Sequence, residues 1–251
     1  MVKTVTIGDL VIGQGQPKII VPIVAKSAEA IIQAAKEISE IDCDFVEWRI
    51  DHFEKVQDFA EVAKLSKQVK ATLAKPLLVT FRTHKEGGVC PLSDESYFKL
   101  YQELIEHGSL DLLDVELFMP EAGVADLITK AHEKAIKIIM CNHDFDKTPS
   151  QETIVERLTM MEEKGADICK IAVMPQSNQD VLTLMSSTAQ ARQKLEQPLI
   201  TMSMGSLGMV TRVSGEAFGS AATFGAAQEA SAPGQVPVGL LRQILTTFKL
   251  N

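Results

Sequence analysis

The sequence has no excess of positive charge and no long apolar run. Its 251 residues include 25 Lys and Arg against 33 Asp and Glu, which gives a formal net charge of −8. A nucleic-acid-binding surface needs basic residues that displace counterions from phosphates, so this class of partner is disfavoured. No apolar stretch approaches the roughly 20 residues that span a bilayer, and residues 1–6 do not resemble a secretory signal. We therefore expect a cytoplasmic protein that binds neither nucleic acid nor a membrane.

Metal-binding and redox motifs are also missing. The four cysteines are Cys43, Cys90, Cys141 and Cys169, and they form no C-x-x-C pair, the spacing typical of zinc ribbons and thioredoxin-like sites. The five histidines show neither H-x-H nor H-E-x-x-H spacing, so the sequence predicts no metal site. Three of the cysteines lie in or beside apolar stretches, where a free thiol behaves as a small apolar side chain.

What the chain does contain is a repeat of apolar, strand-like runs. They begin roughly 30 residues apart, which is the length of a strand, a helix and two short loops. The eight runs are Ile19–Val24, Phe45–Ile50, Leu77–Arg82, Leu112–Leu117, Ile136–Asn142, Ile168–Met174, Leu199–Ser203 and Ala221–Gly225. Helical patterns fill the gaps, and one of them begins at Ser27, a typical N-cap residue. Before the repeat, residues 1–18 place β-favouring residues on either side of Gly8-Asp9, which is typical of a hairpin.

Eight strands that alternate with helices in about 250 residues are typical of a (β/α)₈ barrel. We therefore predict an α/β protein with a TIM-barrel fold, formed by residues 1–251 as a single domain, in which the N-terminal hairpin closes the bottom of the barrel. The alternative is an open, doubly wound sheet. That fold usually has fewer strands, and the G-x-G-x-x-G turn of its dinucleotide-binding members is missing after the first strand.

A barrel of this kind carries its active site at the carboxyl ends of the strands, and charged residues stand out there. Glu47 and Arg49 share one face of the second strand and are predicted to point into the barrel. Trp48 alternates with them on the opposite face, and we also count it among the candidate substrate-binding residues. Arg82 ends the third strand, and Glu86 lies in the loop that follows. The alternative for Glu47 and Arg49 is an ion pair that only stabilises the barrel.

Two further strand residues suggest proton transfer and nucleophilic chemistry. His143 follows the fifth strand, and histidine is the side chain best suited to proton exchange near neutral pH. Lys170 lies within the apolar run Ile168–Met174. Burial and neighbouring cations favour a neutral amine, which attacks carbonyl carbons. The alternatives are a histidine that caps the core and a lysine that pairs with a core carboxylate.

Candidate anion-binding groups follow the seventh and eighth strands. Arg212 offers a planar guanidinium that suits a carboxylate. Ser231 and Gln235 lie in a loop of small residues with Pro and Gly, which we interpret as an active-site lid over residues 225–236. The same composition also occurs in ordinary surface connections.

Taken together, these segments resemble type I 3-dehydroquinate dehydratase over nearly the whole chain. The segments that carry the resemblance are Glu47-Trp48-Arg49-Ile50-Asp51-His52-Phe53, Thr80-Phe81-Arg82-Thr83 with Glu86-Gly87-Gly88, His143-Asp144-Phe145, Lys170-Ile171-Ala172, Thr201-Met202-Ser203-Met204-Gly205, Phe218-Gly219-Ser220-Ala221-Ala222-Thr223-Phe224-Gly225 and Ser231-Ala232-Pro233-Gly234-Gln235. The resemblance implies a (β/α)₈ fold, a homodimer, and the shikimate-pathway conversion of 3-dehydroquinate to 3-dehydroshikimate without a metal or organic cofactor.

The resemblance also implies roles for individual residues. Lys170 would form a Schiff base with the substrate ketone, and His143 would act as general base and then acid, oriented by Glu86. The carboxylate of the substrate would be held by Arg212, Ser231 and Gln235. Its ring hydroxyls and carbonyl side would be contacted by Glu47, Arg49 and Arg82.

Two other functions remain open from the residues. A class I aldolase on the same fold would share Lys170 but often binds phosphate, for which no glycine-rich turn follows the last two strands. A non-catalytic barrel that binds small acids would keep the arginines, but it would have no use for a buried lysine.

Overall fold

The computed structural model describes residues 3–227 and 235–250. Its main sheet contains eight parallel strands that follow one another in chain order. They are β3 (Lys18–Ile23), β4 (Phe45–Arg49), β5 (Leu77–Thr80), β6 (Leu112–Glu116), β7 (Lys137–Asp144), β8 (Ile168–Val173), β9 (Leu199–Ser203) and β10 (Ala222–Ala226). Strand β10 pairs with β3, and the short strand β11 (Val236–Pro237) extends β10 on its other side. The predicted (β/α)₈ barrel is thereby confirmed.

The sheet closes between β9 and β10, where ladder pairing is reduced to a single bridge, Leu199 with Ser220. The Ala221 N–H donates to the Leu199 carbonyl at 2.6 Å. The Ser220 hydroxyl oxygen then accepts the Thr201 N–H at 3.0 Å. A buried side chain thus takes the place of a backbone acceptor at this point, which satisfies an N–H that the interrupted ladder would leave unpaired.

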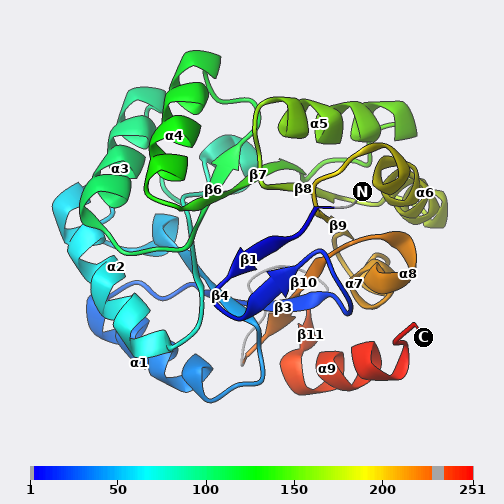
Figure 1. The fold of residues 1–251 in the computed structure, drawn as a ribbon, viewed down its shortest axis with the longest axis horizontal. Coiled ribbons are helices and arrows are strands. Elements are labelled where there is room, and N and C mark those ends of the chain that lie inside the picture. Colours follow the sequence, from blue (N-terminus) through cyan, green and yellow to red (C-terminus); the bar gives the residue numbers. More distant parts are fainter. Residues whose placement is uncertain (1–2, 228–234, 251) are drawn as a thin grey trace.

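Helices surround the barrel in Figure 1. They are α1 (Ala28–Ser39), α2 (Phe59–Leu73), α3 (Asp94–His107), α4 (Glu121–Glu133), α5 (Gln151–Glu163), α6 (Asn178–Lys194), α7 (Met209–Val213), α8 (Gly215–Phe218) and α9 (Val238–Thr247), with short 3₁₀ turns at Ile50–His52 (η1) and His84–Glu86 (η2). The helices α1, α2, α3, α5 and α6 begin after a Ser or Asp whose side chain accepts a backbone N–H of the first turn. Such caps satisfy donors that the helix itself cannot pair.

The N-terminal hairpin consists of β1 (Val5–Ile7) and β2 (Leu10–Ile12), and it crosses the barrel opening in Figure 1. Gly8 in its turn has φ +56°, a left-handed conformation that costs glycine little. Val5 and Ile12 pack against the inward-facing residues at the start of the strands, such as Phe45 and Leu112. The hairpin therefore closes the amino-terminal end of the barrel, as predicted.

Apolar side chains form two layers. The larger layer fills the space between the strands and the helices, and the smaller one fills the barrel interior next to the hairpin. Toward the carboxyl ends of the strands the interior instead contains buried charged residues, including Glu47, Asp114, Glu116 and Lys170. Apolar packing thus closes one end of the barrel, and polar chemistry is concentrated at the other.

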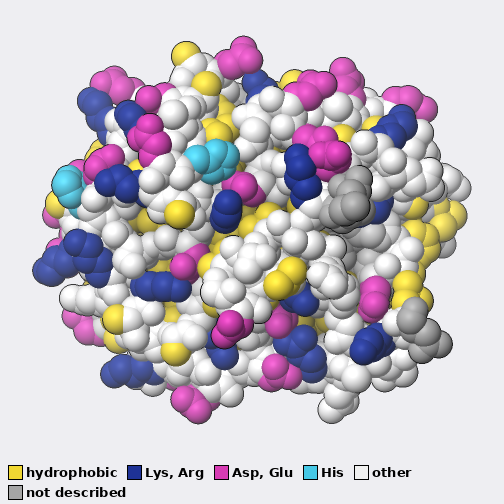
Figure 2. Space-filling model, in the orientation of Figure 1, with side chains coloured by type: hydrophobic (Ala, Val, Ile, Leu, Met, Phe, Trp, Pro, Cys, Tyr) yellow, Lys and Arg dark blue, Asp and Glu magenta, His cyan; other side chains and the backbone are white. Residues whose placement is uncertain are grey.

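The molecular surface carries charges of both signs. On the face shown in Figure 2, acidic and basic side chains alternate around the rim without a large patch of one sign. No helix among the described residues is long and apolar enough to cross a membrane.

Predicted strand boundaries agree with the structure to within a few residues. The largest differences are of two residues, at the ends of β5 and β7. Strand β7 continues to Asp144 because His143 and Asp144 still pair with Ala172 and Val173 of β8. His143 is therefore fixed within a strand. The predicted lid, residues 225–236, falls mainly on residues 228–234, which lie outside the described residues.

Candidate active site

A cavity of about 220 Å³ opens at the carboxyl ends of the strands. Its wall combines apolar side chains, among them Met202, Met204 and Phe224, with ionisable groups. Eight of the residues predicted from the sequence line it, namely Glu47, Arg49, Arg82, Glu86, His143, Lys170, Arg212 and Gln235. A small site with few convergent polar groups in an apolar wall is typical of a pocket for a small molecule.

Lys170 extends from the middle of β8 into this cavity, and only 3% of the residue is exposed. Its Nζ donates to Asp114 Oδ2 at 3.1 Å and lies 3.8 Å from Glu47 Oε1. The same nitrogen lies 5.0 Å from the centre of the Phe224 ring. The charged groups in direct contact with this amine are therefore carboxylates, whereas neighbouring cations were considered from the sequence.

Asp114 and Glu116 of β6 are partners that sequence reasoning missed. Arg82 Nη2 donates to Asp114 Oδ1 at 2.7 Å, and Arg82 Nη1 donates to Glu116 Oε1 at 2.9 Å. Glu116 also accepts the N–H and the hydroxyl of Thr83. Arg82 lines the cavity, but its guanidinium is already held by these two carboxylates. The sequence did contain a signal for them: Asp114 and Glu116 are two residues apart in an apolar strand, so both side chains lie on the same face of that strand.

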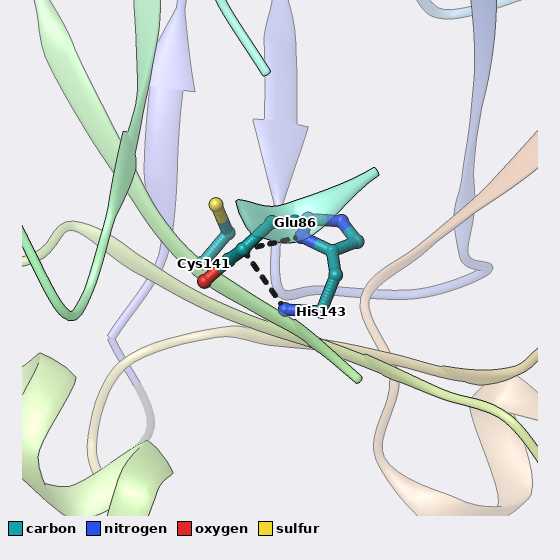
Figure 3. A group of neighbouring side chains, drawn as sticks. All are labelled: Glu86, Cys141 and His143. Carbon is teal, nitrogen blue, oxygen red and sulfur yellow. Dashed lines mark hydrogen bonds and ion pairs between the residues drawn. The ribbon is translucent and has the colours of Figure 1, made fainter. Parts of the chain in front are cut away.

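His143 and Glu86 form a second unit (Figure 3). Glu86, at the end of η2, accepts both the backbone N–H and the ring Nδ1 of His143 at 2.9 Å. Its other oxygen accepts the Asn142 amide at 2.9 Å, and Arg157 of α5 donates to that amide's oxygen. When Nδ1 carries the proton that it shares with Glu86, Nε2 has the lone pair of a base.

Burial and nearby cations set the charge of this pair. Burial lowers the pKa of His143 well below its usual value, and Arg82 and Lys170 lower it further, so the imidazole is neutral at physiological pH. Burial raises the pKa of Glu86 to about 7, against the opposing effect of Arg82. A neutral histidine and a carboxyl group that titrates near neutrality are suited to general acid–base chemistry.

One group of potential metal ligands occurs at this position. The ligand atoms of Glu86, Cys141 and His143 lie within 4.8 Å of one another (Figure 3). Burial raises the pKa of the Cys141 thiol well above its usual value, however, and Sγ lies 3.0 Å from Arg82 Nη1. A metal needs the thiolate, so a protonated thiol beside a guanidinium is poorly suited to bind one.

Glu47 and Arg49 both line the cavity, but they do not form the ion pair considered from the sequence. Arg49 binds Asp51 through two hydrogen bonds of 2.8 Å, and Glu47 accepts the Thr80 hydroxyl at 2.9 Å. Both side chains are thus held in place at the cavity wall.

Trp48 is not brought into the site. Its side chain is fully buried in the layer between strands and helices, where it packs near Phe53 with ring centres 6.2 Å apart. The two-residue alternation of β4 explains this position, because it turns Trp48 outward while Glu47 and Arg49 turn inward. Trp48 therefore supports the strand from behind and is not placed to touch a ligand in the cavity.

The predicted anion-binding residues are only partly covered by the structure. Arg212 of α7 is buried at the cavity wall, and burial lowers its pKa to about 10, so the guanidinium remains charged at neutral pH. Gln235 lines the cavity from the segment before β11. Ser231 lies outside the described residues.

Comparison with known proteins identifies the family. The family model "Type I 3-dehydroquinase" matches residues 19–251. The chain belongs to this family. A 3-dehydroquinate dehydratase from Enterococcus faecalis (strain ATCC 700802 / V583) is 55% identical over 251 residues, which cover 99% of each protein.

Solved structures of type I 3-dehydroquinases and related dehydratases share the whole fold. A 3-dehydroquinate dehydratase from Enterococcus faecalis superposes with a TM-score of 0.93 at 52% identity, and the match covers 98% of this chain and 100% of that one. A type I 3-dehydroquinate dehydratase from Clostridium difficile, solved with covalently modified comenic acid, gives a TM-score of 0.95 at 44% identity and covers 98% of each chain. The family members therefore match the barrel over its full length.

The position of the single tryptophan provides a direct test of the site. Because Trp48 is fully buried behind β4, we expect blue-shifted fluorescence emission and little quenching by acrylamide. Saturation with a substrate analogue should leave the acrylamide quenching constant unchanged, since the ligand does not cover this ring. Free tryptophan serves as the reference for full exposure. Quenching close to that reference, or strong protection by the ligand, would place Trp48 at the cavity after all.

Proposed function

We propose that this chain removes water from 3-dehydroquinate to give 3-dehydroshikimate, through a Schiff base on Lys170, in the shikimate pathway. The observation that carries the proposal is one small cavity lined by a buried lysine amine and by a neutral histidine hydrogen-bonded to a carboxyl group. Membership of the type I 3-dehydroquinase family supports the same reaction.

Lys170 forms the covalent intermediate. Its nitrogen bonds to the ketone carbon, the carbon–oxygen bond breaks, and the ketone oxygen leaves as water with two protons from the nitrogen. An ammonium and a ketone thereby become an iminium and water, and the positive charge is conserved. The iminium withdraws electrons more strongly than the ketone, which acidifies the neighbouring C–H bond.

His143 moves the proton. Its Nε2 removes the proton from the carbon beside the iminium, and the electron pair of that C–H bond forms a neutral enamine. The nitrogen lone pair then restores the iminium as the bond to the departing hydroxyl breaks. His143 returns its proton to that oxygen, which leaves as water. Glu86 holds the ring through Nδ1 and stabilises the charge that develops on it.

Arg212 binds the carboxylate of the substrate. Its planar guanidinium offers paired donors that match a carboxylate, and Gln235 lines the same cavity. We assign Ser231 to this group as well, on the resemblance alone. Glu47 and Arg49, which are held by Thr80 and Asp51, present polar atoms to the ring hydroxyls. Arg82 acts mainly through its charge, because Asp114 and Glu116 occupy its guanidinium.

We also propose that the protein is a homodimer in the cytoplasm. The four cysteines are all free thiols, which fits a reducing compartment. The family resemblance supports the dimer, and light scattering on the purified protein measures it directly. A monomeric mass at micromolar concentration would contradict this part of the proposal.

Trapping the intermediate tests the reaction. With 3-dehydroquinate and borohydride, we expect a stable adduct on the intact protein, mapped by peptide mass spectrometry to Lys170. Lys170→Ala should form no adduct and lose essentially all turnover, because no other amine lines the cavity in the described part of the chain. Lys99→Ala removes an exposed lysine and serves as the matched control. Binding without an adduct would favour a non-catalytic acid-binding barrel, and carbon–carbon cleavage of an alternative substrate would favour an aldolase.

The pH dependence tests the role of Glu86. Its raised pKa of about 7 means that the carboxylate forms as the pH rises through this value, and the ionised group is the stronger acceptor for the Nδ1 proton of neutral His143. The ionised carboxylate stabilises the positive charge that develops on the His143 ring when it takes the substrate proton, and the neutral acid does not, so we expect kcat/KM to increase with pH through about 7. In Glu86→Gln, kcat/KM should fall by about 10²-fold or more. The increase of kcat/KM through pH 7, which is the acid limb of the profile, should also disappear, since the amide does not titrate.

Glu95→Gln, which changes an exposed carboxyl group on α3, should keep the wild-type profile. An acid limb near pH 7 that persists unchanged in Glu86→Gln would rule out Glu86 as its source.

A further inference from the structure

Asp114 of β6 lies against the reacting nitrogen of Lys170, and the proposed reaction gives it no role. Its Oδ2 accepts Lys170 Nζ at 3.1 Å, and the residue has no exposed surface. Glu47, the other nearby carboxylate, is farther away at 3.8 Å and already accepts the Thr80 hydroxyl. Asp114 is therefore the principal negative charge that faces the amine.

The charge on the Lys170 nitrogen changes during the reaction in a defined order. It is positive as the ammonium, positive as the iminium, neutral in the enamine and positive again in the product iminium. A fixed carboxylate beside this atom favours each cationic species at a buried position where little water is available to solvate it. Without such a group, the iminium loses its proton and becomes a neutral imine, which is a much weaker electron acceptor.

We propose that Asp114 is a catalytic residue whose carboxylate is the counter-ion of the Lys170 nitrogen and keeps the Schiff base protonated. This inference rests on the proposed function, because it concerns the intermediate on Lys170.

The surroundings of Asp114 keep its carboxylate charged and in place. Burial alone would raise its pKa, but Arg82 and Lys170 reverse that effect, and the pKa is about 2. Oδ1 accepts Arg82 Nη2 at 2.7 Å and the Cys141 thiol at 2.9 Å. The Tyr101 hydroxyl of α3 donates to the Asp114 carbonyl at 2.7 Å and so ties the strand itself. The carboxylate is thus oriented before any substrate arrives.

Other ionisable groups surround Asp114 and Lys170, so a test of Asp114 must distinguish its effect from theirs. They come from the neighbouring strands, turns and helices: Glu47 and Arg49 of β4, Arg82 after β5, Glu86 of η2, Tyr97 and Tyr101 of α3, Glu116 of β6, and Cys141 and His143 of β7. Of these, Glu116 offers the best comparison. It is a carboxylate on the same strand that also binds Arg82, but its hydrogen bonds are to Arg82 and Thr83 and not to Lys170.

The test compares Asp114→Asn with Glu116→Gln. Adduct formation with 3-dehydroquinate is followed by mass spectrometry in cyanoborohydride across a range of pH, and turnover is measured in parallel. The rate of adduct formation plotted against pH is the trapping profile. In Asp114→Asn we expect this profile to move to lower pH by at least about one unit, because loss of the negative charge favours the neutral amine and the unprotonated imine. We also expect kcat to fall by about 10²-fold. Glu116→Gln should leave the trapping profile where it is in the wild type.

Measuring the trapping profile and turnover together distinguishes a counter-ion from a residue with only a structural role. A merely structural defect slows trapping at every pH, whereas loss of the counter-ion accelerates it at low pH while turnover falls. An unshifted profile in Asp114→Asn, or an equal shift in Glu116→Gln, overturns the proposal for Asp114. Failure of the wild type to form any adduct instead overturns the Schiff-base reaction itself.

Circular dichroism verifies that each variant is folded. If Asp114→Asn does not fold, Asp114→Glu carries the test, because it keeps the charge. Its trapping profile should stay within about half a pH unit of the wild type, and a downward shift of one unit or more would contradict the proposal.

Discussion

The buried charges inside the barrel have to be paired, and the active site is organised around this requirement. Arg82 and Lys170 place two cations at positions with little exposure to water, and Asp114 lies between them with one oxygen on each. Removing one partner of such a buried pair typically costs about 3–5 kcal/mol, because it leaves an uncompensated charge. The network is therefore a strong constraint on the positions of these side chains.

The fold makes that network possible. Each parallel strand contributes an inward-facing side chain at its carboxyl end, and neighbouring strands bring these side chains within hydrogen-bonding distance. The hairpin and the apolar interior layer close the other end. The cavity consequently opens on one side, where His143 and Glu86 on one wall and Arg212 on another surround the Lys170 amine.

The sequence predicted the barrel, its strands and most of the cavity wall, because a charged residue within an apolar strand is an unusual and local signal. Lys170, His143 and Glu47 were found in this way. Which charged residues pair with each other could not be predicted from the sequence, since Asp114 and Lys170 are 56 residues apart and meet only through the register of the strands. Arg49 is a different case, because its partner Asp51 is only two residues away and the sequence pattern did not distinguish Asp51 from Glu47 as its partner. For Trp48, the two-residue alternation already indicated the outward position that the structure has.

The central claim is that the ketone of the substrate becomes an imine on Lys170, and oxygen exchange tests it most directly. Imine formation expels the ketone oxygen as water, and hydrolysis of the product imine installs an oxygen from the solvent. In water enriched in oxygen-18, early 3-dehydroshikimate should therefore carry one solvent-derived atom in its ketone for each turnover, beyond the exchange of substrate and product without enzyme. Product that retains the original ketone oxygen would show that water is eliminated without a covalent intermediate, and it would contradict this account.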